Sequence, residues 1–147
     1  MKTILLSTLL ALALAAPAFA DDKAEMEAFM AAYLERWNAH DADTITANFY
    51  RFDAEHRWST AAGLKAEFDR LKSEGYDKSD ILGIVGCAVG PNAGQVELRF
   101  IRRTTDGGFM PPKDRTSIYT VRKFADGWRV TSLRGLPAGE RMSCPLS

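Results

Sequence analysis

The spacing of apolar residues changes near the middle of the chain from a helical period to a strand period. Over residues 22–74 the apolar residues recur every three or four positions, which places them along one face of a helix. From residue 81 onward they form a continuous run and then alternate with polar residues, as in β-strands. Because the helical segments precede the strands, the sequence predicts an α+β domain with three helices packed on one face of a curved antiparallel sheet of four long strands.

Three helices are expected in the first half of the chain. The first spans about residues 22–39 and carries one apolar stripe, formed by Met26, Phe29, Met30, Tyr33, Leu34 and Trp37. Asp41 or Asp43 can cap a short second helix, because a carboxylate accepts the free N–H groups of a first turn. We therefore interpret His40 and Asp41 as turn and cap residues rather than as a catalytic pair. A third helix begins after Ser59 or Thr60 and ends near residue 74.

Four strands are expected in the second half. The first is the apolar run at 81–89, and a turn at 91–94 leads to the second at 95–103. A loop at 104–115 precedes the third strand at 116–124, and a tight Asp126-Gly127 turn joins it to the fourth at 128–136. Successive strands joined by hairpins predict a meander of antiparallel neighbours.

The first 20 residues have the pattern of a signal peptide. A basic start precedes the apolar run at 4–16, and residues 17–20 end in the Ala-x-Ala sequence that a signal peptidase accepts. The apolar run is shorter than the ~20 residues that a membrane-spanning helix needs. We therefore expect cleavage after Ala20, a single exported domain at 21–147 that is periplasmic or secreted, and no membrane attachment after cleavage.

The charge balance of the chain gives no reason to expect nucleic acid as a partner. The chain has 19 Lys and Arg residues and 19 Asp and Glu residues, so no net positive charge attracts nucleic acid.

Two cysteines, Cys87 and Cys144, follow the expected signal peptide, and an even number in an exported protein favours a disulfide. The alternatives are a buried free thiol at Cys87 and a bond between chains through Cys144.

Two motifs in this order resemble those of a known superfamily. A helix that ends in Tyr-x-x-x-Trp-Asn-Ala-x-Asp at 33–41 is followed by a short helix ending in Phe49-Tyr50, and residues 126–130 read Asp-Gly-Trp-Arg-Val. Together they resemble the NTF2-like (SnoaL-like, cystatin-like cone) domains over about residues 25–136. The resemblance implies a cone with a pocket between helices and sheet, and a homodimer formed through the open sheet face.

The acid–base residues of ketosteroid isomerase, an enzyme of this fold, are largely missing. That enzyme uses an Asp base together with a Tyr and a protonated Asp that hold the oxyanion. Tyr33 falls where the resemblance implies the oxyanion Tyr. The base position falls on Arg57, which stays protonated, and the second acid position falls near Tyr119 or Thr120.

Other catalytic chemistry has few candidates. Asp53, Glu55 and His56 are the titratable residues near the expected base position, and they remain weak catalytic candidates beside Tyr33. The two His residues form no HxxxH or HxE pattern and the cysteines form no CxxC, so we expect no metal. Gly83 and Gly86 lie in a strand with no following helix, so they predict no phosphate loop and we expect no cofactor.

A binding pocket inside the cone is the remaining site hypothesis. Arg102 shares strand parity with Phe100 and should point toward the mouth of the cone, where it pairs with an anionic ligand, pairs with a buried carboxylate, or extends into solvent. Aromatic residues with a few polar tips suit a small, partly apolar ligand, and plain core packing is the alternative explanation. The candidate pocket residues are Tyr33, Trp37, Trp58, Phe100, Arg102, Tyr119 and Trp128.

Three functions remain open from the sequence. The first is an exported, non-catalytic domain that binds a small ligand or a protein partner. The second is a small-molecule isomerase or dehydratase of the ketosteroid-isomerase or SnoaL type. The third is a structural dimeric protein of the cell envelope.

Overall fold

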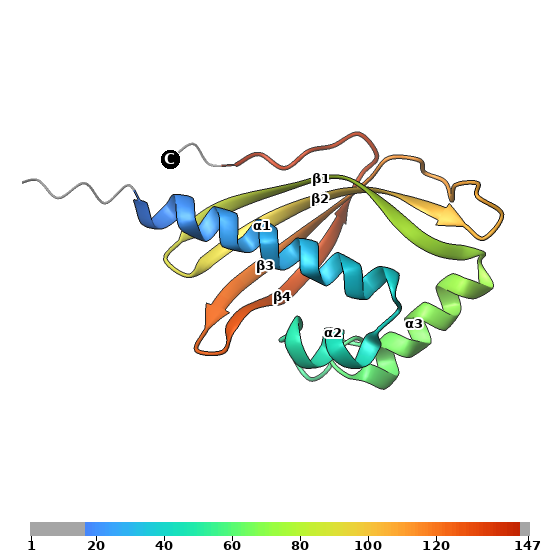
Figure 1. Cartoon of the computed structure of the whole chain (residues 1–147), viewed down its shortest axis with the longest axis horizontal. Coiled ribbons are helices and arrows are strands. Elements are labelled where there is room, and N and C mark those ends of the chain that lie inside the picture. Colours follow the sequence, from blue (N-terminus) through green and yellow to red (C-terminus); the bar gives the residue numbers. More distant parts are fainter. Residues whose placement is uncertain (1–16, 145–147) are drawn as a thin grey trace, which may run out of the picture.

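The helices precede a four-stranded antiparallel sheet in the computed structural model, which describes residues 17–144 (Figure 1). The helices are α1 (Pro17–Asn38), α2 (Ala42–Asn48) and α3 (Ala61–Ser73). The strands β1 (Tyr76–Gly90), β2 (Ala93–Thr104), β3 (Arg115–Phe124) and β4 (Gly127–Leu136) pair in the order β1-β2-β3-β4. The predicted α+β cone, with three helices on one face of a curved sheet, is confirmed.

The break after α1 is a corner at which the side chains of Asn38 and Asp41 form hydrogen bonds with backbone groups. His40 has a φ of 53°, and the Asp41 carboxylate accepts a hydrogen bond from the Thr44 N–H at 3.1 Å, which caps α2. The Asn38 side chain forms two hydrogen bonds with the backbone of Ser79 on β1, at 3.0 and 2.9 Å. The chain therefore turns at a point where α1 is fixed to the sheet.

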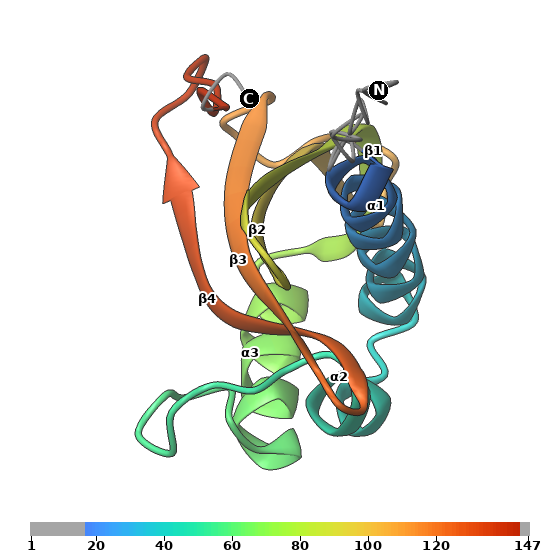
Figure 2. The same cartoon turned by 90° about the vertical axis from the view of Figure 1, so that its left-hand side faces the viewer.

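The segment that follows α2 closes one end of the cone. The Arg51 N–H donates to the Val130 carbonyl at 2.9 Å, and the Val130 N–H donates to the Phe49 carbonyl at 2.8 Å. Figure 2 shows α2 and α3 together at the end of the curved sheet that this segment closes, with α1 along its side. The Thr60 side chain caps α3 through the Gly63 N–H at 3.2 Å.

Helix α1 begins earlier than its stripe indicates. Its described part already includes residues 17–21, which precede the predicted start at residue 22. Residues 17–20, the end of the expected signal peptide, therefore belong to α1, whereas residues 1–16 lie outside the described residues. No helix within residues 17–144 has the length and apolar character needed to cross a membrane.

Strand β1 is longer than its apolar run. Its first five residues are mostly polar, and they join the sheet by pairing with the end of β2, Tyr76 opposite Thr104 and Asp80 opposite Ile101. An ion pair of 2.6 Å between Asp80 and Arg103 accompanies this pairing. Strand β1 lies at the edge of the sheet, where the Gly86 N–H donates to the Glu27 carboxylate of α1 at 2.9 Å.

Four tyrosines contribute hydroxyls to the interior. Tyr33 is 1% exposed, its hydroxyl lies 2.8 Å from that of Tyr50, and its ring centre is 5.5 Å from that of Tyr119. Burial raises the pKa of all four tyrosines, Tyr33, Tyr50, Tyr76 and Tyr119, and that of Tyr119 reaches about 12. The fold therefore holds these phenols in the neutral form.

The C-terminal segment crosses the outer face of the sheet, on the side opposite α1 (Figure 1). Glu97 of β2 is 3% exposed. Its carboxylate accepts a hydrogen bond from the Met142 N–H at 2.5 Å and forms an ion pair with the Arg141 guanidinium at 2.8 Å. The predicted disulfide within one chain is present between Cys87 and Cys144, whose Cα atoms are 5.7 Å apart. We call residues 137–144 the C-terminal strap.

We expect removal of the disulfide to destabilise the protein and release the C-terminal strap. The bond joins residues 57 positions apart, and a loop of this length corresponds to about 4 kcal/mol in the chain-entropy model. Urea unfolding of a Cys87→Ser/Cys144→Ser variant should show this loss, and the Met142 amide should exchange its hydrogen faster. Wild-type protein in a thiol reductant serves as the control. Unchanged stability together with unchanged exchange at Met142 would contradict the expectation.

We expect the tyrosines to make folding stability fall at high pH. Their folded pKa values lie above the value of about 10 in an unfolded chain, so their contribution is complete below that pH. It is lost as pH rises toward about 12, the folded value for Tyr119. Tyrosinate absorbance should therefore rise together with loss of near-ultraviolet circular dichroism. Tyrosinate that forms near pH ~10 in folded protein would show that the phenols are accessible.

Candidate functional site

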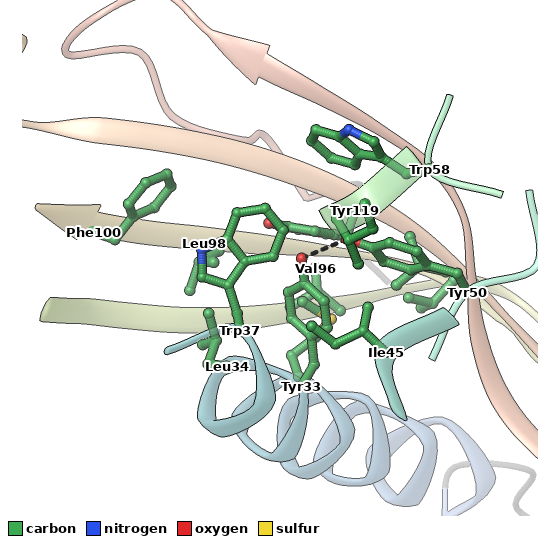
Figure 3. Close-up of a cluster of buried hydrophobic side chains, with 14 of the residues drawn as sticks. Tyr33, Leu34, Trp37, Ile45, Tyr50, Trp58, Val96, Leu98, Phe100 and Tyr119 are labelled. Atoms are coloured by element: carbon green, nitrogen blue, oxygen red, sulfur yellow. Dashed lines mark hydrogen bonds between the residues drawn. The ribbon is translucent and has the colours of Figure 1, made fainter. Parts of the chain in front are cut away.

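A cavity of about 70 Å³ lies between α1, the segment after α2 and the inner face of the sheet. Figure 3 shows side chains of its wall, among them Trp37, Trp58 and Tyr119, within the buried cluster. This volume is below the ~300 Å³ at which sites for drug-sized molecules begin. It is about half the ~150 Å³ of an engineered cavity that binds benzene. The lining residues are Leu34, Trp37, Trp58, Ser79, Leu98, Phe100, Arg102, Ser117, Tyr119 and Leu133.

Strand alternation and the α1 stripe place these side chains. Leu98, Phe100 and Arg102 occupy alternate positions on β2 and therefore share the inner face. Ser117 is paired with Leu98 across the sheet, and Tyr119 of the same strand is paired with Leu133 on its other side. The wall is thus built from all four strands together with α1 and the segment before α3.

Aromatic rings fill most of the space beside the cavity. The Trp37 indole N–H donates to the Tyr76 hydroxyl at 3.0 Å, and that hydroxyl lies 2.9 Å from the Ser79 hydroxyl. The Trp58 ring is 5.9 Å from the Trp37 ring and is 8% exposed. The indole N–H of Trp58 is buried and finds no acceptor among residues 17–144.

Arg102 is the one charged residue of the described lining. It is half-buried, and its Nε is buried with no hydrogen-bond partner in the described part of the chain. Its guanidinium lies 5.7 Å from the centre of the Tyr76 ring and 6.0 Å from that of Phe100. These contacts hold the charge against aromatic faces, which attract cations, but they supply no hydrogen-bond acceptor.

The structure brings together five of the seven residues predicted for the pocket, which are Trp37, Trp58, Phe100, Arg102 and Tyr119. Tyr33 lies behind Tyr119, with its hydroxyl bonded to Tyr50. Trp128 donates its indole N–H to Glu25 at 2.9 Å and does not line the cavity. Five further lining residues were not predicted for the pocket, namely Leu34, Ser79, Leu98, Ser117 and Leu133. Strand parity with Phe100 could have identified Leu98.

The other weak catalytic candidates, like Tyr33, do not line the cavity. Asp53 and Glu55 are exposed. The His56 ring stacks on Phe52 at 4.0 Å, and its Nδ1 accepts the backbone N–H of Trp58 at 3.1 Å. Arg57, at the position of the isomerase base, is also exposed and lies 3.6 Å from Glu67. None of these side chains belongs to the described wall of the cavity.

The described residues contain no cluster suited to a metal ion. In residues 17–144, no three His, Cys, Asp or Glu side chains lie together as ligands. The cavity wall offers hydroxyls, indole N–H groups and a guanidinium, and these donate hydrogen bonds. The arrangement can therefore hold a hydrogen-bond acceptor.

Solved structures similar to this chain share its fold at low sequence identity. An NTF2-like protein with a cystatin-like fold from Novosphingobium aromaticivorans matches with a TM-score of 0.58 and 16% identity, over 79% of this chain and 81% of that one. An NTF2-like superfamily protein from Salmonella enterica serovar Typhimurium has a TM-score of 0.58 and 14% identity, with coverages of 82% and 94%. A ketosteroid isomerase-like protein from Erwinia carotovora atroseptica has a TM-score of 0.50 and 16% identity, with coverages of 78% and 95%.

A search of curated proteins finds no match to this chain. A family model described as NTF2-like protein (DUF6841) matches residues 22–137, which span α2, α3, all four strands and most of α1. The match covers well over half of the chain and agrees with the cone architecture. The chain therefore belongs to the NTF2-like family DUF6841.

Proposed function

We propose that this chain is an exported domain that binds a small, partly apolar molecule in the cavity of the cone and does not act as an acid–base catalyst. One observation carries the proposal. The cavity is lined by apolar side chains, hydroxyls and one guanidinium, and its described wall has no carboxylate or imidazole. Such a wall can hold and orient a ligand, since a few placed polar groups within an apolar surface give a site its specificity.

Proton abstraction lacks a suitable group in this wall. A general base works best with a pKa near the operating pH. The phenol of Tyr119 has a pKa of about 12, because burial disfavours its ionised form, and arginine stays protonated. Similarity to a ketosteroid isomerase-like protein at 16% identity concerns the fold alone. The wall thus favours binding over isomerase or dehydratase chemistry.

The proposal includes export and a homodimer formed through the sheet. Export rests on the leader pattern in residues 1–20. The dimer is supported by apolar side chains that β1 leaves exposed, namely Ile81, Leu82, Val85 and Val89. Of these, Val85 is 38% exposed and lies opposite Glu97 in the sheet, so both side chains share the outer face. The C-terminal strap covers Glu97, and Val85 remains partly exposed beside it.

The cavity can be tested by filling it. Ser117→Leu adds an apolar side chain to the cavity wall, so it should abolish the rise in melting temperature and the tryptophan fluorescence change that small ligands cause. A panel of short alcohols, ketones and acids serves as the probe. Ser132→Leu is the matched control, because Ser132 is exposed on the neighbouring strand. It should respond to the panel as the wild type does.

Two results would contradict this reading. A wild-type protein that responds to no compound of the panel would reject small-molecule binding. Accelerated exchange of the α-protons of a small ketone in deuterated water, followed by nuclear magnetic resonance, would reject the non-catalytic part.

The proposed homodimer is tested separately, by measuring the mass of the protein in solution. Light scattering coupled to gel filtration should give twice the mass of the mature chain, and Val85→Glu should shift the protein to a monomer because it places a charge in an apolar contact. Glu35→Gln, an exposed position on α1, is the control and should leave the mass unchanged. A wild-type monomer would contradict the dimer and would leave the cavity proposal intact.

A further inference from the structure

We propose that the ligand of this cavity is a small carboxylate anion, with its charged head against Arg102 and a short apolar tail inside the cone. This inference rests on the proposed binding function and adds the chemical class of the ligand. Four observations lead to it. Arg102 has no partner in an ion pair among the described residues, and the nearby carboxylate of Glu67 is bonded to Arg70. A second guanidinium lies beside Arg102, and the cavity has a size that limits the ligand.

Among the described residues, Arg102 has no partner in an ion pair. The residue lies two positions beyond Phe100 on the inner face of β2, and it lines the cavity. No carboxylate forms an ion pair with it among the described residues, and its Nε is buried without an acceptor. The buried Nε is a donor that lacks an acceptor among the described residues, so this half-buried guanidinium can take up the acceptor group of a ligand.

The buried carboxylate near Arg102, that of Glu67, is already paired with other arginines. Glu67 is 6% exposed, and it binds Arg70 through two hydrogen bonds of 2.7 and 3.1 Å. A second cation, Arg57, lies 3.6 Å away from it. Burial raises the pKa of Glu67, but the hydrogen bond from Arg70 and the charges of Arg57, Arg70 and Arg102 lower it overall. Glu67 is thus within the field of Arg102 but is bonded to other residues.

A second guanidinium lies on the same face. Arg115 of β3 is paired with Phe100 across the sheet, so Arg102 and Arg115 are diagonal neighbours on the inner face. The Nε of Arg115 is also buried without an acceptor in residues 17–144, and one of its terminal nitrogens donates to the Pro111 carbonyl at 2.5 Å. Burial and the positive charge of Arg102 lower the pKa of Arg115. An anion at this end of the cavity would reduce the repulsion between the two cations.

The remaining polar groups also favour an acceptor. The buried indole N–H of Trp58 has no partner among the described residues, and the hydroxyls of Ser117 and Tyr119 can each donate. Water could satisfy individual N–H groups, but it carries no charge to balance a guanidinium. A carboxylate supplies two oxygens and a negative charge, and it matches the fork of an arginine.

The volume sets the length of the tail. The cavity of about 70 Å³ is roughly half of one that holds benzene, so it admits a tail of about three carbon atoms. The apolar part of the wall, formed by Leu34, Leu98 and Leu133, suits such a tail. Butyrate therefore has the charge and size that the site requires.

The test compares molecules of one size and different charge. Butyrate, butan-1-ol and butylamine are titrated at constant ionic strength into the mature protein, and binding is followed by calorimetry and by the indole N–H resonances of the three tryptophans. We expect butyrate to bind at least about tenfold more tightly than the other two, because a charge-assisted hydrogen bond is stronger than a neutral one. We also expect it to shift the Trp58 resonance.

Variants locate the site. Arg102→Gln should weaken butyrate binding by at least about tenfold. Arg102→Lys should retain part of the affinity, because it keeps the charge and loses the fork. Arg99→Gln removes the same charge from the outer face and should bind as the wild type does. The comparison of the three ligands needs no variant, so it stands even if Arg102→Gln proves unstable.

The outcomes separate the two levels of the proposal. If butan-1-ol binds as tightly as butyrate, the cavity binds small molecules but the carboxylate assignment is wrong. If butyrate binds equally well to folded Arg102→Gln, the head group does not contact Arg102 and the assignment is likewise wrong. If none of the three ligands binds, both the assignment and the binding of molecules of this size are rejected.

Discussion

Two hydrogen bonds between the side chain of Asn38 and the backbone of Ser79 fix the end of α1 on β1. They hold the end of the helix in the orientation in which its apolar stripe faces the sheet and Trp37 lines the cavity. They also set the point at which the chain turns through His40 into the capped start of α2. The position of α2, and of the segment that pairs with β4 after it, follows from this corner. The cavity depends on that segment, since Trp58 forms part of its wall.

Much of this architecture is present in the sequence because it depends on local patterns. The α1 stripe, the cap at Asp41 and the alternation along β2 each follow from the spacing of a few residues, and each is found in the structure. The start of β1 could not be predicted, because its polar residues join the sheet through pairing with β2, which lies far along the chain. That pairing is decided by tertiary contacts and leaves no apolar pattern.

The site was predictable in part for the same reason. Strand parity placed Arg102 and Phe100 on the inner face, where both line the cavity. Trp128 shares a face with the buried Val130, yet its indole binds Glu25 and lies away from the cavity, because parity gives the face of a strand but not the position along the cone. Ser79 and Ser117 carried no signal, since small polar residues occur on either face. The free volume itself depends on how the aromatic rings pack.

The contact of Glu27 with the Gly86 N–H has a consequence for self-association in fibres. An edge strand exposes backbone donors to which a strand of another molecule can add, and β1 is long and is apolar over residues 81–89. The Glu27 carboxylate occupies one of these donors and places charge and helix across the edge. Although burial raises the pKa of Glu27, the hydrogen bonds from Gly86 and Lys23 lower it overall. The carboxylate therefore stays ionised in mildly acidic surroundings, and the Gly86 N–H stays occupied there.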